Sequence, residues 1–424
     1  MGHSRPELSR SRHQFQNAFR LAMDSIRAHK LRSFLTLLGV IIGVASVIMV
    51  GAAIEGLGVY AQQSTAKAFG SESFLVAQIA ATGRLSRREL FDKLKRNKPI
   101  RTADARFVEA AEGERVLYSP YRNHLSDVKR ENLICEDTSI IGVAADMADI
   151  RDIGVVEGRF FTQQEDHSRA YVAVIGDTLK STLFPGDASP LNRIVRIDGV
   201  EFTVIGVQER LGSAFGRDQD KSAYIPVTAF DRLYGSGNGF ALFGRPKPGS
   251  GLTLQDALDL TRVTLRNRFH ARPGQPDNFD TLTPDAIRGF IDQLLAMVAA
   301  VVVPVTCISL VVGGIVIMNI MLVSVTERTR EIGIRKAVGA RVDDVMLQIL
   351  IEAVVQAGMG GALGVALGAL VTMLLGRIFD LSLHITAGYV VLALAVSGIV
   401  GVVSGWYPAR RAARMDPVVA LRAE

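Results

Sequence analysis

Charged side chains that could bind a partner are concentrated in residues 327–341, ERTREIGIRKAVGAR, with five basic and two acidic residues. This segment follows residues 294–325, a run of 32 residues without a single charge. Glu331 and Arg335 are four residues apart in the order that favours a helix, and Gly339 is of the type that ends one. The spacing therefore predicts a short charged helix after a long apolar segment.

Three apolar residues remain inside this charged segment, namely Ile332, Ile334 and Val338. A helix that is fixed at both ends to membrane spans and exposes apolar side chains is suited to docking into a partner protein. The alternative is an amphipathic turn that rests on lipid headgroups. The residues by themselves leave both interpretations open.

The sequence shows no recognisable catalytic or metal-binding set. His124, His167 and His270 have no neighbours at metal-ligand spacing, and no Gly-x-Ser-x-Gly segment occurs. The sequence contains no Gly-Lys pair, so the phosphate-binding loop Gly-x-x-x-x-Gly-Lys-Ser/Thr is missing. We therefore expect no enzyme activity, no cofactor and no metal in this sequence.

Four charge-free segments are long enough to cross a bilayer: residues 34–54, 294–325, 353–376 and 385–409. A hydrocarbon core of roughly 30 Å needs about 20 helical residues. Core helices of a soluble protein usually have a polar face, and these segments have none. With 48% hydrophobic residues, the chain is predicted to be a membrane protein.

The positions of lysine and arginine predict the orientation. Residues 1–33 hold seven, the segment around 327–341 five and the tail after residue 408 four, whereas the short loop after residue 376 has only Arg377. Both termini and the charged link are therefore expected in the cytoplasm, and residues 55–284 outside. The net charge of +6 reflects this topology and gives no reason to expect nucleic-acid binding.

The outside segment is predicted to be a mixed α/β domain. Val- and Ile-rich runs flank the Asp-Gly pair at Asp198 and Gly199, the strongest short hairpin signal in a sequence. Segments such as SRRELFDKLKR and LTLQDALDLTRVTLRNRF favour helices. The basic run 84–106 either binds lipid headgroups or an acidic partner, or is simply solvated.

The second span exceeds the bilayer, because its 32 residues would rise about 48 Å as a helix. Part of it should project outward as a stalk, with a kink at Pro304. Glu352 lies either at membrane depth or in an interfacial turn. Small residues at four-residue spacing predict close helix contacts within the bundle or between subunits; they are Gly39 and Gly43, then Gly360, Gly364 and Gly368, then Ser397, Gly401 and Gly405.

These signals set the predicted boundaries. The N-terminal segment 1–33 has Phe15, Phe19, Ala22 and Ile26 at helical spacing among basic residues, as in a helix lying on the inner membrane face. A solubilising leader is the alternative. The segments expected after it are span one (34–54), the outer domain (55–284), stalk and span two (285–326), the charged link (327–342), span three (343–376), span four (385–407) and a cytoplasmic tail (408–424).

Several segments, taken together and in order, resemble the permeases of MacB/FtsX-type ABC transporters. TERTREIGIRKAVGAR resembles the coupling-helix signature of that family, and YPARRAARMDPVVALRAE its C-terminal signature. The first span, from KLRSF to AAIEGL, is similar to the span of the family. EGRFFTQQED, VAVIG, FTVIGV and YIPVTAFDRLYG resemble its periplasmic core domain.

The resemblance implies a permease subunit that couples ATP hydrolysis by a separate ATPase chain to movement of the periplasmic domain. It implies a multi-pass protein of the inner membrane, a second permease copy, contact with lipid, and a periplasmic adaptor and outer-membrane duct as further partners. Export of drugs, peptides or other molecules from the periplasm is the implied activity. The residues that match the coupling-helix motif are Glu331, Ile332, Gly333, Arg335, Lys336 and Gly339.

Two other functions stay open within this family. A lipoprotein-releasing permease would need an apolar cavity above the spans. A regulator of a cell-wall hydrolase would use the same movement of its outer domain to switch on a bound enzyme.

Overall fold

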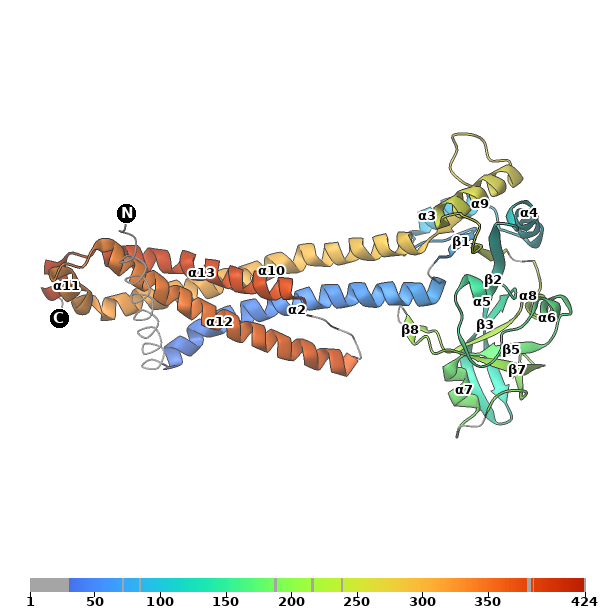
Figure 1. The fold of residues 1–424 in the computed structure, drawn as a ribbon, viewed down its shortest axis with the longest axis horizontal. Helices are drawn as coiled ribbons and strands as arrows, with labels where there is room; N and C mark the ends of the chain where they lie inside the picture. The colour runs from blue at the N-terminus through green and yellow to red at the C-terminus, as the bar shows by residue number, and fades with distance from the viewer. Residues whose placement is uncertain are drawn as a thin grey trace, which may run out of the picture. The chain divides into compact units, whose positions relative to one another are not determined.

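The computed structural model describes residues 30–70, 72–83, 85–186, 189–214, 217–237, 239–379, 383 and 385–422. The proposed amphipathic N-terminal helix, Arg84 and the last two residues lie outside the described part. The chain divides into two compact units (Figure 1). One, the helical unit, combines the chain up to Tyr60 with Leu294–Glu424; the other, the outer domain, is Ala61–Gln293.

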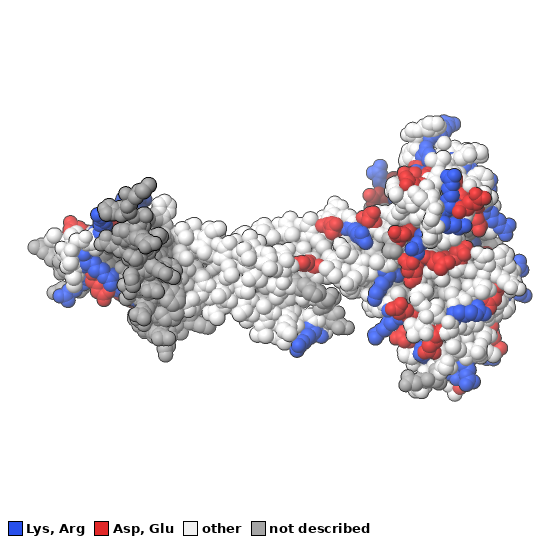
Figure 2. All heavy atoms as spheres, in the orientation of Figure 1, with Lys and Arg blue, Asp and Glu red and all other residues white. Residues whose placement is uncertain are grey.

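Among the described residues, four long helices are apolar enough to cross a membrane, which confirms the four predicted spans. They are α2 (Lys30–Phe69), α10 (Pro284–Glu327), α12 (Val342–Phe379) and α13 (Ala387–Ala413). The short helices α11 (Thr329–Ala337) and α14 (Pro417–Arg422) follow α10 and α13. Figure 2 shows an uncharged band around the middle of the helical unit and charged side chains at the end that carries α11.

Small residues allow these helices to pack closely, as their spacing predicts. A Cβ on Gly39 would lie 2.9 Å from Cα of Gly313 in α10, and one on Gly364 would lie 2.8 Å from the Val44 side chain in α2. In α13, the hydroxyl of Ser397 donates a hydrogen bond of 2.5 Å to the carbonyl of Ala357 in α12. Backbones that approach this closely gain packing contacts that larger side chains would prevent. The contacts lie within one chain.

The outer domain has the predicted mixed α/β fold, built on one large sheet with the order β12-β1-β11-β2-β3-β10-β5-β7-β4, and β6 paired with both β2 and β7. The strands are β1 (Phe74–Ala77), β2 (Val116–Arg130), β3 (Leu133–Val143), β4 (Val155–Gly158), β5 (Val172–Ile175), β6 (Ile194–Ile197), β7 (Val200–Gln208), β10 (Ser222–Pro226), β11 (Ala241–Pro246) and β12 (Asp280–Leu282). A separate pair is formed by β8 (Ser213–Ala214) and β9 (Arg217–Asp218).

In the described part of the outer domain, seven helices accompany this sheet. They are α3 (Arg87–Arg96), α4 (Thr102–Glu112), α5 (Met147–Ile150), α6 (Gln163–His167), α7 (Asp177–Leu183), α8 (Val227–Tyr234) and α9 (Leu254–Arg268). One apolar core lies under α4 and α9 and includes Phe74 and Val108. A second lies under α7 and α8 and includes Leu179 and Ala229. The two helix groups thus cover different parts of the sheet.

The predicted hairpin at Asp198 and Gly199 is confirmed. Ile197 of β6 pairs with Val200 of β7 in antiparallel register, so the two residues form the whole loop. Their φ values are 47° and 82°. Two-residue hairpin loops with both φ values positive favour Asp-Gly, because Gly has no Cβ to clash in that conformation.

The two helices that connect the units meet neighbouring strands of the outer domain. β1 follows α2 in the chain, and β12 immediately precedes α10. The two strands pair in antiparallel register, with Leu75 opposite Leu282 and Ala77 opposite Asp280. The ends of α2 and α10 are therefore tied to the same edge of the sheet.

Candidate functional site

The charged link forms the helix α11, and it packs against more of the chain than its sequence suggests. Five of the six residues singled out in the sequence lie in α11, and Gly339 follows it with φ at 105°. A non-glycine residue would be strained in that conformation. The amide of Ala340 then donates to the carbonyl of Arg335 at 3.0 Å, which ends the helix.

Ile332 faces inward and is only 7% exposed, in a core cluster with Val345, Ile349 and Ala409. The expectation that Ile332 is exposed for docking is therefore wrong, because α11 packs this side chain against α12 and α13. Ile334 and Val338 remain 48% and 85% exposed. These two are the apolar side chains of the link that a partner could contact.

Lys336 binds the tail of the chain. Its ammonium group donates to the carbonyls of Ala413, at 2.7 Å, and of Met415, at 2.6 Å. Ala413 is the last residue of α13, where unpaired carbonyls favour a cation. Lys336 therefore caps α13 and holds the segment that leads into α14.

A small polar cavity of about 210 Å³ lies between α11 and the neighbouring ends of α10 and α12. Arg335 reaches across to α12, where its guanidinium donates to the side chain of Gln348 at 2.9 Å. Glu352, 6% exposed, lies 3.5 Å from the guanidinium of Arg328. Because the Glu352 carboxylate is buried, loss of this ion pair would be costly. Glu331 also lines the cavity.

The roles of Arg328 and of the tail were not visible in the sequence. The helical spacing of Gln348, Glu352 and Gln356 does mark a polar stripe, and the stripe gives two of the cavity residues. Lys336 and Ala413, however, are 77 positions apart, and no local pattern relates them.

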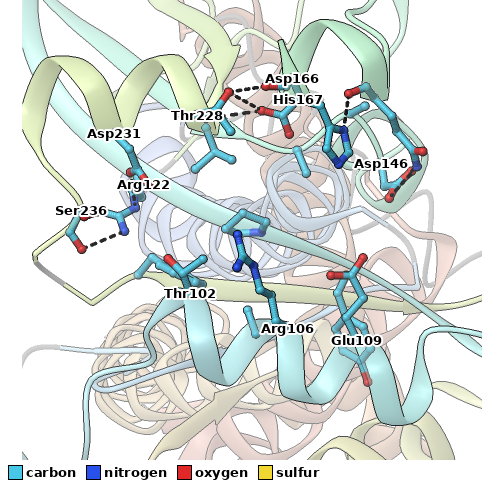
Figure 3. A pocket seen from close by; sticks show the side chains of 18 of the residues that line it. Thr102, Arg106, Glu109, Arg122, Asp146, Asp166, His167, Thr228, Asp231 and Ser236 are labelled. Atoms are coloured by element: carbon cyan, nitrogen blue, oxygen red, sulfur yellow. Dashed lines mark hydrogen bonds and ion pairs between the residues drawn. The ribbon is translucent and has the colours of Figure 1, made fainter. Parts of the chain in front are cut away.

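The outer domain has a second candidate site, a groove of about 710 Å³ between α4 on one side and α6 and α8 on the other (Figure 3). Its floor is β2, where Tyr118, Pro120 and Arg122 point to one face because strand side chains alternate. The Arg122 side chain is 6% exposed and its Nε lies 3.1 Å from Asp231 of α8. This ion pair joins the floor of the groove to one wall.

Asp166 of α6 lies on the same wall of the groove, at the end away from Asp231 (Figure 3). Its Oδ1 accepts hydrogen bonds from the hydroxyl of Thr228 at 2.9 Å and from the amide of Thr228 at 3.3 Å. Burial raises the pKa of the Asp166 carboxyl, and nearby Asp146 adds to this effect. Among the described residues, no group of three or more His, Cys, Asp or Glu side chains could hold a metal ion.

The fold and the link define the class of protein: a multi-pass membrane protein with an α/β domain inserted between its first two spans. Residues 33–260 match the family model described as MacB-like periplasmic core domain, and residues 303–417 match the FtsX-like permease C-terminal model. The chain therefore belongs to the family of MacB/FtsX-type ABC transporter permeases. Both matched domains are permease domains.

Relatives with curated names agree with this assignment. The macrolide export ATP-binding/permease protein MacB of Bdellovibrio bacteriovorus is 35% identical over 95% of this chain and 61% of its own length. The protein of the same name from Rhodospirillum rubrum is 36% identical, over 97% and 61%. The crystal structure of the periplasmic region of MacB from Actinobacillus actinomycetemcomitans aligns with a TM-score of 0.43 and 15% identity, covering 54% of this chain and 95% of that one. The chain spans about three-fifths of the length of these curated relatives.

Proposed function

We propose that this chain is the permease part of an ABC exporter, in which an ATPase binds at α11 and its movement is passed to the outer domain. The observation that best supports this proposal is that α11 is fixed to three other elements, namely α10, α12 and the segment after α13. A displacement of α11 would therefore move the spans with it. The names of the relatives, which pair permease with ATP binding and macrolide export, support this function.

The geometry gives the six motif residues different roles in this proposal. Ile332 and Gly333 are buried and join α11 to the bundle. Arg335 and Lys336 fix α11 to α12 and to the tail through the bonds described above. Glu331 lines the cavity beside Arg335, and Gly339 ends the helix. The exposed side chains of Ile334 and Val338 would contact the ATPase.

The wider arrangement is part of the same proposal. The ATPase is a separate chain and lies in the cytoplasm, where both termini and α11 also lie, and the protein lies in the inner membrane. Much of α10 remains apolar and exposed, as at Met297 (60%), Val301 (66%) and Ile308 (63%). Such a surface needs lipid or a second permease copy to cover it. A periplasmic adaptor and an outer-membrane duct would complete an export path from the periplasm.

The exposed apolar residues of the link give the direct test. The double variant Ile334→Asp, Val338→Asp should lose the ATPase on gentle purification, and stimulated ATP hydrolysis should fall at least about tenfold, since burying two unpaired carboxylates in an interface costs more than about 1.4 kcal/mol. Membrane insertion should not change. Mass spectrometry of the co-eluting proteins and hydrolysis assays in proteoliposomes measure both effects.

The matched control is Val263→Asp, which places a carboxylate at a 66% exposed valine of α9. It should retain the ATPase at the wild-type ratio. A double variant that still co-elutes with an active ATPase would show that α11 is not the docking element.

A further inference from the structure

The groove of the outer domain contains charged side chains that the coupling proposal does not use. Four carboxylates line it: Glu109, Asp146, Asp166 and Asp231. Four guanidinium groups line it as well, those of Arg106, Arg122, Arg169 and Arg232. Formal charges therefore cancel. A groove for a simple anion or a simple cation would carry an excess of one sign, whereas balanced charges suit a ligand that bears both.

One end of the groove favours a positive group. Asp166 is 9% exposed, and both hydrogen bonds from Thr228 to its carboxyl group go to Oδ1, while the Thr228 hydroxyl also contacts the backbone carbonyl of Asp166. In the described part of the chain, no side chain forms an ion pair with it. Burial is the main cause that raises the pKa of the Asp166 carboxyl, and Asp146 adds a smaller effect, whereas the Thr228 hydrogen bonds and His167 act in the opposite direction. A buried carboxylate next to a second carboxylate is stabilised by a bound cation.

His167 adds an acceptor to this end. Its Nδ1 lies 2.6 Å from the carbonyl of Gln163; because a carbonyl can only accept, Nδ1 carries the proton, and Nε2 of the neutral ring is an acceptor. Figure 3 shows His167 between Asp166 and Asp146 on the groove wall. An ammonium group, which has three donors and no acceptor, matches this set.

Among the other charged side chains of the groove, Arg106 is the one placed to bind an anionic group further along. Arg122 is already paired with Asp231, and Arg232 lies over the ring of Tyr171 at 5.8 Å. Arg106 points from α4 into the groove (Figure 3). Its guanidinium can bind a carboxylate with two parallel hydrogen bonds.

We propose that this groove binds a short peptide with free ends, whose ammonium group contacts Asp166, the most buried acid of this end, and whose carboxylate contacts Arg106. The groove volume of about 710 Å³ is within the range of small-ligand sites. This names a ligand class for the exporter proposed above. Binding is measured without an ATPase, so the site and the coupling mechanism can fail independently.

Calorimetric titration of the full-length protein in detergent with tetra-alanine tests the site. We expect saturable binding that weakens at least about tenfold when the peptide is N-acetylated, because acetylation removes the charge that Asp166 would contact. Amidation of the carboxyl terminus should weaken binding similarly in the wild type and have little further effect in Arg106→Gln.

Asp166→Asn is the decisive variant, because the asparagine side chain keeps an oxygen for the Thr228 hydrogen bonds and loses only the charge. Binding of tetra-alanine should fall to the level of the N-acetyl peptide. Asp259→Asn is the control, since Asp259 is an exposed acid of α9 that pairs with Arg262 outside the groove; its affinity should match the wild type. Absence of saturable binding, equal binding of the acetylated peptide, or wild-type affinity in Asp166→Asn would each overturn the proposal.

Discussion

Glu165 and Asp166 are neighbours in the chain and carry the same functional group, yet the fold shifts their acidities in opposite directions. Hydrogen bonds from the Arg159 guanidinium, at 2.7 Å to each oxygen, lower the pKa of Glu165 to about 2. Burial raises the pKa of Asp166. The charged form of Glu165 stabilises the fold, whereas burial makes the charged form of Asp166 unfavourable. Sequence gives no hint of the difference, because burial and the approach of Arg159 depend on the tertiary fold.

The Glu165 shift predicts how acid affects the outer domain. A lowered pKa means that the stabilisation is complete above the unfolded value near 4.5 and is lost as pH falls toward about 2. Because the Arg159 side chain is 55% exposed, solvent screening reduces the contribution to about 1 kcal/mol. Arg159→Gln should lower the free energy of unfolding by this amount at pH 7 and have almost no effect near pH 2.

Urea unfolding followed by the near-ultraviolet circular dichroism of the tyrosines measures this difference, since five of the eight tyrosines lie in the outer domain: two in β2, one each in β10 and α8, and one directly before β5. Arg193→Gln, which changes an arginine outside the α6 region, should show the wild-type pH profile. If Arg159→Gln lowered the free energy of unfolding equally at pH 7 and pH 2, the guanidinium would stabilise the domain by packing and not by its charge.

At the scale of elements, Asp280 of β12, the strand before α10, adds side-chain contacts to α3 and its C-cap and to the segment after β1. Its carboxylate accepts from the ammonium of Lys93 at 2.6 Å, from the side-chain amide of Asn97 at 3.1 Å and from the backbone amide of Ala80 at 3.1 Å. Lys93 belongs to the basic run whose role the sequence left open. Part of that run therefore stabilises the chain internally.

Asp280→Asn should loosen these contacts. The neutral amide of the variant cannot balance the charge of Lys93, whose side chain is only 27% exposed, and breaking such a partly buried pair costs about 2 to 3 kcal/mol. Amide hydrogen exchange in β12 and in the first turn of α10 should speed up about 30- to 160-fold if those amides exchange through local opening. Mass spectrometry of peptic fragments measures the change.

Asp285→Asn is the matched control, because Asp285 is an acid only five residues further along the chain, in the first turn of α10, and is 81% exposed. Exchange in β12 should stay at the wild-type rate in that variant. Unchanged exchange in Asp280→Asn would show that the β1–β12 pairing holds β12 without the carboxylate.

For the whole molecule, signals that lie within one stretch of sequence predicted the structure well. Charge-free runs gave the four spans, and the Asp198–Gly199 pair gave a hairpin with its register. The parallel pairing of β3 with β10 joins residues about 80 positions apart. The hydrogen bond from Lys336 to the carbonyl of Ala413 joins residues 77 positions apart. Such pairs are chosen by packing in three dimensions, so no local pattern in the sequence encodes them. The same reason explains why Ile332 was expected at the surface.

The whole arrangement requires α11 and the outer domain to lie on opposite sides of the membrane, which labelling in spheroplasts can establish. Cys135 and Cys307 are replaced by serine and alanine, and a single cysteine is placed at Val338, 85% exposed beside α11, or at Val263, 66% exposed on α9. A membrane-impermeant maleimide should label Val263→Cys in intact spheroplasts and Val338→Cys only after permeabilisation. Because the two positions are separated by the single membrane span in α10, they must differ in access if that span crosses the bilayer. Labelling of Val338→Cys from outside would leave no cytosolic ATPase able to reach α11, and the coupling mechanism would then be wrong even if the outer groove binds its peptide.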